Sequence, residues 1–324
     1  DAIVATGSSP VTLPNFPVDG ESIVDSESLL FRNSLPEQLT LIGGGYIGVE
    51  LATVFAKLGS RVVVVEAEEQ LLPGFSKNLS KKLEKGLRSL GVGICLGYEA
   101  ISFDKNELLI ENSSGSSSIP TEILGVVAGR RPNSEIVNIT ETGASLTPSG
   151  HVIVDPQRRA TEHIFAIGDL TPGPALAHKA TSEARVAADA ACGIPNAFEP
   201  NCIPMVVFSD PQIVTVGIDP DLISRNEKDF ISFRFPFSAS SRAKTLRDDS
   251  GFVNIVADNE GTVVGFQALG KHVAELAGEA ALAIETAATL EDLAVTIHAH
   301  PTMGETIAEA SLGLSGAPLH FSDK

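Results

Sequence analysis

The sequence predicts an α/β protein whose nucleotide-binding part is built on parallel strands and is followed by an α+β domain. Apolar strands alternate with helical segments over residues 39–90, which is the pattern of βαβ units. A glycine-rich turn at residues 43–48 joins the first of these strands to the first helix. After residue 199, short strands separated by polar turns precede two helical stretches, as expected for an antiparallel sheet with helices.

Prolines and glycines mark the ends of the elements in the first βαβ unit. Its expected elements are strands at residues 39–42 and 61–66 and helices at residues 46–58 and 79–90. Pro36 precedes the first strand, Gly59 ends the first helix, and Gly91 ends the second, whose leucines recur at helical spacing. Residues 112–118 are rich in serine and glycine, which predicts the loop of a hairpin.

A second unit and the α+β domain complete the chain. The expected elements are strands at residues 123–128, 151–155 and 164–167, an alanine-rich helix through residue 191, strands near residues 206, 214, 231, 253 and 263, and helices at residues 274–288 and 290–297. Pro195 stops the alanine-rich helix, and the stretch that begins at Glu305 reads as a further helix.

The composition argues against nucleic-acid and membrane functions. The chain of 324 residues has 41 acidic and 23 basic side chains, a net charge of −18, which disfavours binding to a phosphate backbone. No apolar run reaches the roughly 20 residues of a membrane helix. Cys95, Cys192 and Cys202 have neither CxxC nor metal-site spacing. We interpret them as structural thiols of a reducing compartment and predict no metal site.

A dinucleotide-binding fingerprint is the strongest motif. Gly43, Gly45 and Gly48 match G-x-G-x-x-G after a strand and at the start of a helix. These glycines allow a tight turn, close approach of a pyrophosphate and packing of helix on strand. Glu66 ends the next strand, where a carboxylate would bond the adenosine ribose and repel a 2′-phosphate, so NAD is favoured over NADP. The alternative is a turn with a purely structural use.

Two further carboxylates are candidates for ligand contact. Asp169 follows the strand at residues 164–167, and the carboxyl ends of strands are where open α/β sheets bind ligands. The helix that opens at residues 175–178 would stabilise negative charge at its N-terminus. The alternatives are a cap or Asx-turn for Asp169 and a capping or surface role for His178. Glu50, in an apolar helix, is by itself best explained by a solvated face.

A histidine beside a proline is the candidate for proton transfer. Pro301 restricts His300 to non-helical backbone, and their peptide bond is one of the kind that adopts cis. Glu305, five residues on, would hold one nitrogen of the His300 ring and leave the other to exchange a proton. The alternative is a turn whose histidines touch solvent or cap the following helix.

These blocks occur in a fixed order along the whole chain: ATG, GGGYIGVE, Glu66, AGRRPN, IFAIGDL, ALAHKA, FSDPQ and HAHPTMGE. In that order the sequence resembles the pyridine nucleotide–disulfide oxidoreductases, which are flavoproteins. The HAHPT form and the closing run through His320 are similar to the branch of this family that oxidises dihydrolipoyl groups.

The resemblance implies a role for each matching residue. FAD would be bound by Thr6, Gly7, Ser8, Asp169, Ala175, Leu176, Ala177 and His178. NAD would be bound by Gly43, Gly45, Tyr46, Ile47, Gly48, Glu50, Glu66 and Gly129. Within the second set, Tyr46 would gate access of the nicotinamide to the flavin, and Glu50 would face the flavin. His300 would be the general acid and base for thiols across a two-fold dimer, oriented by Glu305.

The sequence departs from the family pattern at its beginning. The first G-x-G-x-x-G for FAD and the Cys-x4-Cys redox pair followed by Lys are not in these residues. Because Asp1 leads directly into an apolar strand, we expect the chain to be the C-terminal two-thirds of a longer protein, inactive alone. The expected parts are residues 1–35 (remnant of the FAD domain and crossover), 36–150 (NAD domain), 151–198 (second FAD segment) and 199–324 (dimerisation domain).

The function that the resemblance implies is FAD-dependent oxidation of protein-bound dihydrolipoyl groups with NAD as acceptor. The alternatives are another disulfide reductase of the same family and a non-catalytic fragment that binds NAD and dimerises. The implied partners are a second copy of the chain and the lipoyl domains of 2-oxoacid dehydrogenase or glycine cleavage complexes. The implied compartment is the cytoplasm of a prokaryote or, in a eukaryote, an organelle matrix.

Overall fold

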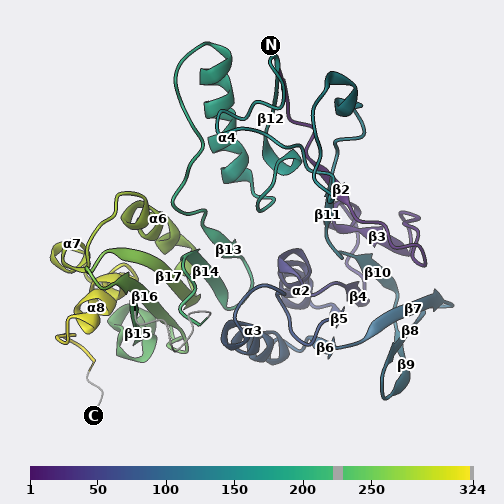
Figure 1. The fold of residues 1–324 in the computed structure, drawn as a ribbon. Helices are drawn as coiled ribbons and strands as arrows, with labels where there is room; N and C mark the ends of the chain where they lie inside the picture. The colour runs from purple at the N-terminus through teal and green to yellow at the C-terminus, as the bar shows by residue number, and fades with distance from the viewer. Residues whose placement is uncertain (222–228, 322–324) are drawn as a thin grey trace. The chain divides into compact units, whose positions relative to one another are not determined.

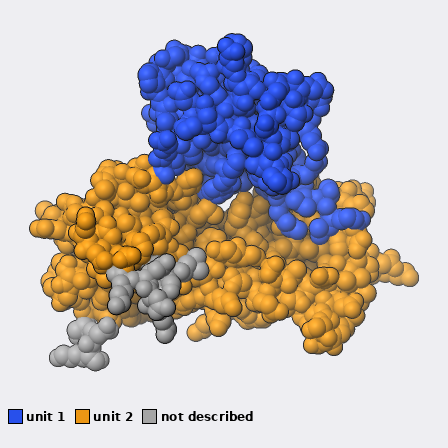
Figure 2. Space-filling view, in the orientation of Figure 1, with its two compact units in different colours: residues 1–14, 128–200 blue, residues 15–127, 201–324 orange. Residues whose placement is uncertain are grey.

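The computed structural model describes residues 1–221 and 229–321 and divides into two compact units (Figure 2). Unit 1 consists of residues 1–14 and 128–200, and unit 2 consists of residues 15–127 and 201–324. Each unit joins segments that are distant in sequence. The predicted division at residues 35, 150 and 198 stays a prediction.

Unit 2 contains the predicted parallel sheet. Its strands lie in the order β3 (Ile23–Asp25), β10 (Ile123–Val126), β4 (Gln38–Ile42), β5 (Arg61–Glu66) and β6 (Gly93–Leu96), all parallel to their neighbours. The helices α2 (Tyr46–Leu58) and α3 (Lys77–Ser89) follow β4 and β5, which confirms the predicted βαβ alternation (Figure 1). The edge strand β3, preceding α1 (Ser26–Leu30), is too short to be predicted from its pattern.

The βαβ helices begin and end as their sequences direct. Ser76 caps α3, accepting a hydrogen bond from the N–H of Leu79, and Gly59 ends α2 in the left-handed conformation that glycine adopts without strain. Leu79, Leu83 and Leu87 are fully buried against the sheet. The predicted amphipathic helix therefore packs by its leucine face.

A three-stranded antiparallel sheet extends from this domain. It consists of β7 (Glu99–Asp104), β8 (Glu107–Asn112) and β9 (Gly115–Pro120). The hairpin is confirmed, but the predicted loop at residues 112–118 is too long, because residues 115–118 pair with β8. The β9 strand is almost wholly exposed, so its serines do not show the apolar alternation by which strands are recognised.

The C-terminal part of unit 2 is the predicted antiparallel sheet with helices. Its strands lie in the order β13 (Met205–Val207), β14 (Gln212–Gly217), β17 (Val263–Gly270), β16 (Phe252–Asp258) and β15 (Phe230–Pro236). Its helices are α5 (Ser241–Thr245), α6 (Ala277–Glu285), α7 (Leu290–Val295) and α8 (Glu305–Leu314). Phe235, Phe266 and Ile307 are buried in the core between these elements.

The two sheets of unit 2 share apolar core. Val207 and Ile213 are buried in the same cluster as Leu79 of α3. The cis Asp210–Pro211 turn lies against Gly86, where a Cβ atom would overlap the proline ring. Only glycine therefore fits at residue 86, which explains why a glycine stands inside this helix.

Unit 1 is smaller and loop-rich. The strand β1 (Ala2–Val4) pairs in parallel with β12 (Ile164–Ala166), and β2 (Ser8–Pro10) pairs antiparallel with β11 (Arg130–Pro132). The one-turn helices η1 (Ile139–Thr142) and η2 (Gly168–Leu170) and the alanine-rich helix α4 (Ala177–Ala191) complete it. The predicted strand at residues 151–155 is wrong: only Val152 forms a bridge, with Leu146. Asp155 instead turns the chain, accepting a hydrogen bond from the N–H of Arg159.

No helix in residues 1–221 and 229–321 has the length and apolar character to cross a membrane.

Candidate functional site

The glycine loop of unit 2 has the geometry of a phosphate cradle. It joins β4 to α2, as predicted, and no side chain caps the N-terminus of the 13-residue helix. A Cβ atom at Gly48 would overlap the carbonyl oxygen of Gly43, whereas a Cβ at Gly45 would meet no atom within 4 Å. Gly48 is thus required by the packing of helix on strand, whereas Gly45 faces open space. These residues fit the pyrophosphate of a dinucleotide.

Glu66 lies at the end of β5, next to this loop, and is buried. Its Oε2 accepts a hydrogen bond of 2.5 Å from the N–H of Gly44, and its Oε1 accepts one of 2.9 Å from the N–H of Glu68. The carboxylate therefore ties the loop to the strand end. Its contact with a ribose stays a prediction.

Glu50 is held by the C-terminal sheet domain of unit 2. Its Oε1 accepts a hydrogen bond of 2.8 Å from the N–H of Phe208, just after β13. Burial raises the pKa of Glu50, and the Phe208 N–H offsets part of that rise. The solvated-face interpretation is wrong for this side chain, because it is half-buried and bonded. Tyr46 and Ile47 lie one turn earlier in the same helix.

In unit 1, Asn133 bonds two of the residues predicted to be near the flavin, Thr6 and Gly7, and also Ser9, which was not predicted. Its side-chain amide donates to the carbonyl of Thr6 at 3.0 Å, and its backbone N–H donates to the carbonyl of Gly7 at 2.9 Å. The hydroxyl of Ser9 donates to the Asn133 side chain at 2.7 Å. The AGRRPN block, in which Gly129 also lies, thus fixes the turn after β1. Sequence reasoning used this block only for NAD and missed Asn133.

Asp169 lies in η2, directly after β12, as predicted. Its Oδ2 accepts a 2.5 Å hydrogen bond from the hydroxyl of Ser8, which in turn accepts one from Nε of Arg130 at 2.6 Å. Two of the predicted flavin residues are therefore in direct contact. The N-terminus of α4, preceded by Ala175 and Leu176 and including Ala177 and His178, has no side-chain cap. A half-buried carboxylate and an uncapped helix end fit the hydroxyl-rich chain and ring of FAD.

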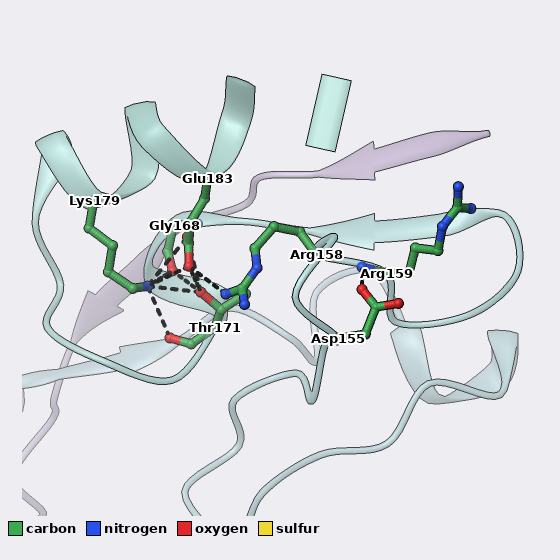
Figure 3. A network of polar contacts seen from close by, with 7 residues as sticks. All are labelled: Asp155, Arg158, Arg159, Gly168, Thr171, Lys179 and Glu183. Atoms are coloured by element: carbon green, nitrogen blue, oxygen red, sulfur yellow. Dashed lines mark hydrogen bonds and ion pairs between the residues drawn. The ribbon is translucent and has the colours of Figure 1, made fainter. Parts of the chain in front are cut away.

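A buried polar network around Gly168, the residue before Asp169, was not predicted (Figure 3). Lys179 and Glu183, one turn apart on α4, are almost completely buried. Nζ of Lys179 donates to the carbonyl of Gly168 at 2.9 Å, and Glu183 accepts the N–H of Gly168 at 2.6 Å. Thr171 and Arg158 complete the network, with hydrogen bonds of 2.9 Å and 3.0 Å to Glu183.

The network fixes Gly168, because its backbone N–H donates to Glu183 and its carbonyl accepts from Lys179 (Figure 3). The signal in the sequence is a Lys and a Glu four residues apart in an alanine-rich helix. That spacing is normally interpreted as an exposed ion pair. Only the tertiary structure shows that Lys179 and Glu183 are buried.

The predicted imidazole–carboxylate pair is present in unit 2. Nδ1 of His300 lies 2.8 Å from Oε1 of Glu305, the first residue of α8. Oε2 of Glu305 accepts the N–H of Thr302 at 2.8 Å. Burial acts to raise the pKa of Glu305, but the hydrogen bonds from His300 and Thr302 outweigh it and hold the pKa below its ordinary value. The His300–Pro301 peptide bond is cis.

The other histidine of the HAHP segment is bonded differently. Nδ1 of His298 lies 2.9 Å from the carbonyl oxygen of Thr296, and its Nε2 lies 2.7 Å from Oε1 of Glu279. Both nitrogens of His298 are therefore engaged. No described residue bonds Nε2 of His300, whose side chain is 69% exposed. The geometry thus selects His300 as the ring that can exchange a proton.

The three cysteines all lie in the described part of the chain and none forms a disulfide. Burial raises the pKa of the thiols of Cys95 and Cys202, which keeps them protonated and poorly nucleophilic. In residues 1–221 and 229–321 no group of three His, Cys, Asp or Glu side chains has metal-site geometry.

Models of protein families match two long parts of the chain. Residues 1–184 match the model of a family described as pyridine nucleotide-disulphide oxidoreductase. Residues 203–311 match the dimerisation domain of the same family.

Named relatives cover almost the whole chain. The dihydrolipoyl dehydrogenase of Geobacillus stearothermophilus is 40% identical over 330 aligned positions, which span 100% of this chain and 70% of that protein. The dihydrolipoyl dehydrogenase of Halobacterium salinarum is 39% identical, over 98% of this chain and 69% of that protein.

Solved structures show the same fold. LpdA from Mycobacterium tuberculosis superposes with a TM-score of 0.89 at 27% identity, over 96% of this chain and 69% of that one. The flavoprotein disulfide reductase RclA from Escherichia coli superposes with a TM-score of 0.86 at 25% identity, over 95% of this chain and 72% of that one.

Proposed function

Because the chain belongs to the pyridine nucleotide-disulphide oxidoreductase family, we propose that it oxidises dihydrolipoyl groups with NAD as the final acceptor. The observation that carries this proposal is the pair of His300 and Glu305, in which the carboxylate holds one nitrogen of the His300 ring and the other nitrogen stays accessible. FAD and NAD are its cofactors. When bound, FAD carries electrons from a dithiol to NAD.

His300 would accept the proton that a thiol loses when it attacks a disulfide. Glu305 stabilises the resulting imidazolium, because its pKa is held low and its carboxylate stays charged. The disulfide of this chemistry is not among the three separate cysteines of the sequence. The protein is a homodimer through its dimerisation domain, and we infer that His300 serves the disulfide of the partner subunit.

Backbone groups, together with a few side chains, would bind the two nucleotide cofactors. In unit 2, the uncapped N-terminus of α2 and the glycine loop would bind the pyrophosphate of NAD, and Glu66 would meet the adenosine ribose. In unit 1, Thr6, Ser8 and Asp169 would bind hydroxyl groups of FAD, with the dipole of α4 directed at the ring. Lipoyl domains of multienzyme complexes are the proposed partners, and the cytoplasm is the proposed compartment.

A substrate panel tests this function. The complete enzyme, with FAD and its redox disulfide, would be assayed for NAD reduction with dihydrolipoamide and for disulfide reduction with oxidised glutathione and NAD(P)H. The proposal expects turnover of dihydrolipoamide with NAD to exceed glutathione turnover by at least about 100-fold, since the two substrates differ in shape and charge. Equal or higher activity with glutathione would instead make the protein another disulfide reductase of the family.

A further inference from the structure

A second imidazole–carboxylate pair lies beside the first. Nδ1 of His320 lies 2.6 Å from Oε1 of Glu309, and no described residue bonds its Nε2. The His320 side chain is 64% exposed, close to the 69% of His300. Both histidines thus have one nitrogen on a carboxylate and the other open to solvent.

The two carboxylates come from one helix. Glu305 and Glu309 are four residues apart on α8, so they lie on the same face, one turn from each other. A small pocket joins the pairs, and its lining includes His300, Glu305, Glu309 and His320. The remaining lining comes from β15, η3 (Phe237–Ala239), Ser240, α5 and α8, and consists of uncharged side chains. Among the described residues, these four groups are therefore the titratable ones that line the pocket.

The position of His320 is built into the fold. Oε2 of the buried Glu309 accepts the backbone N–H groups of Leu319 and His320, at 3.0 Å and 3.2 Å. The next residue, Phe321, packs edge-to-face against Phe233 and Phe235 of β15. The closing segment of the chain is thereby fixed on α8 and the sheet.

We propose that His320, which is paired with Glu309, is a positioning residue for His300: the charge of the His320 ring tunes the proton affinity of the His300–Glu305 pair across the shared pocket. The charge of His320 already lowers the pKa of Glu305, which supports the proximity of the two pairs. A protonated His320 would disfavour a second positive charge on His300, because the two charges repel each other, and a neutral His320 would permit it. This inference rests on the proposed proton-transfer role of His300.

The test compares His320→Gln, which is always neutral, with His320→Lys, which is always positive in the range of histidine titration. Ring protons of His300, assigned with His300→Gln, would be titrated by NMR in protein with ¹³C-labelled histidine. We expect the midpoint to be higher in His320→Gln than in His320→Lys by about 0.5 pH unit, with the parent between them, as for a unit charge in a water-exposed pocket. The acidic side of the pH profile of dihydrolipoamide turnover should shift in the same direction as the His300 midpoint.

His163 supplies the matched control, because it also pairs through Nδ1 with a carboxylate, that of Asp1, and is not part of the lining of the pocket that His300 and His320 share. His163→Gln and His163→Lys should leave the His300 midpoint unchanged. Equal midpoints in the two His320 variants, or the reverse order, would overturn the coupling. The ring titration needs no turnover, so a parent protein that fails to oxidise dihydrolipoamide would refute the proposed function and leave the coupling test intact.

Discussion

Nδ1 of His300 lies 2.8 Å from Oε1 of Glu305, while the other oxygen of that carboxylate accepts the N–H of Thr302. The carboxylate is therefore fixed at both oxygens, and it fixes the plane of the ring. The peptide bond between His300 and Pro301 is cis. The exposed Nε2 is the atom left for chemistry.

The glycine loop makes a prediction about packing. Gly48→Ala should lower stability by about 1–3 kcal/mol, because the new methyl overlaps the carbonyl of Gly43 and the helix must move away from the strand. NAD affinity should fall at least about tenfold, since the loop shifts with it. Gly278→Ala is the control: this helical glycine has open space around it, so the change should be neutral or slightly stabilising. Thermal unfolding and NAD titration decide between them.

Glu66 makes a prediction about cofactor choice. Glu66→Arg removes a carboxylate that would bond the adenosine ribose and adds a cation that attracts a 2′-phosphate. The ratio of kcat/KM for NAD to that for NADP should fall by at least about tenfold. Glu66→Gln is the matched control, because its side-chain oxygen can still accept the Gly44 N–H. An unchanged ratio in the Arg variant would show that Glu66 serves only the loop.

Lys179 makes a prediction about the network in unit 1. Lys179→Met leaves the buried Glu183 with one cation fewer and removes one of the hydrogen bonds to the carbonyl of Gly168, so we expect a loss of about 3 kcal/mol of stability. Retention of flavin on gel filtration should fall too, because Asp169 follows Gly168. Lys85→Met, at an exposed position of α3, should change neither quantity. Wild-type stability in Lys179→Met would mean that the network contributes little.

Glu50 makes a prediction about pH. Burial raises its pKa above the ordinary value of 4.5, so its charged form destabilises the fold as pH rises from 4.5 through the folded-state pKa. Glu50→Gln removes that charge and keeps an oxygen for the Phe208 N–H. The variant should unfold at a higher temperature than the parent at pH 7, and the difference should vanish below about pH 4.5, where both states of Glu50 are protonated. A difference that persists at pH 4 would exclude this cause.

Much of the fold follows from local patterns in the sequence. The strand at residues 61–66 and the helix at residues 46–58 are found with their predicted bounds, because β-branched runs and glycine ends act locally. The pairing of His300 with Glu305 was predictable for the same reason, since both residues belong to one turn and the helix after it.

What the sequence could not reveal depends on tertiary contact. Asn133 bonds residues more than 120 positions away, and Glu50 bonds a backbone N–H 158 positions away. The pair of Lys179 and Glu183 has the spacing of a surface ion pair and is nevertheless buried. His320 could be noticed as part of a closing run, but its proximity to His300 exists only once α8 has formed.

Dihydrolipoamide turnover by the His300→Gln variant of the complete enzyme is the most direct test of the role of this ring. Loss of its proton transfer should lower kcat by about 100- to 10,000-fold, while the flavin spectrum and the dimer stay as in the parent. Glu260→Gln, in an exposed turn, should behave as the parent. Turnover of His300→Gln within a factor of two of the parent, with normal flavin content, would contradict the assignment.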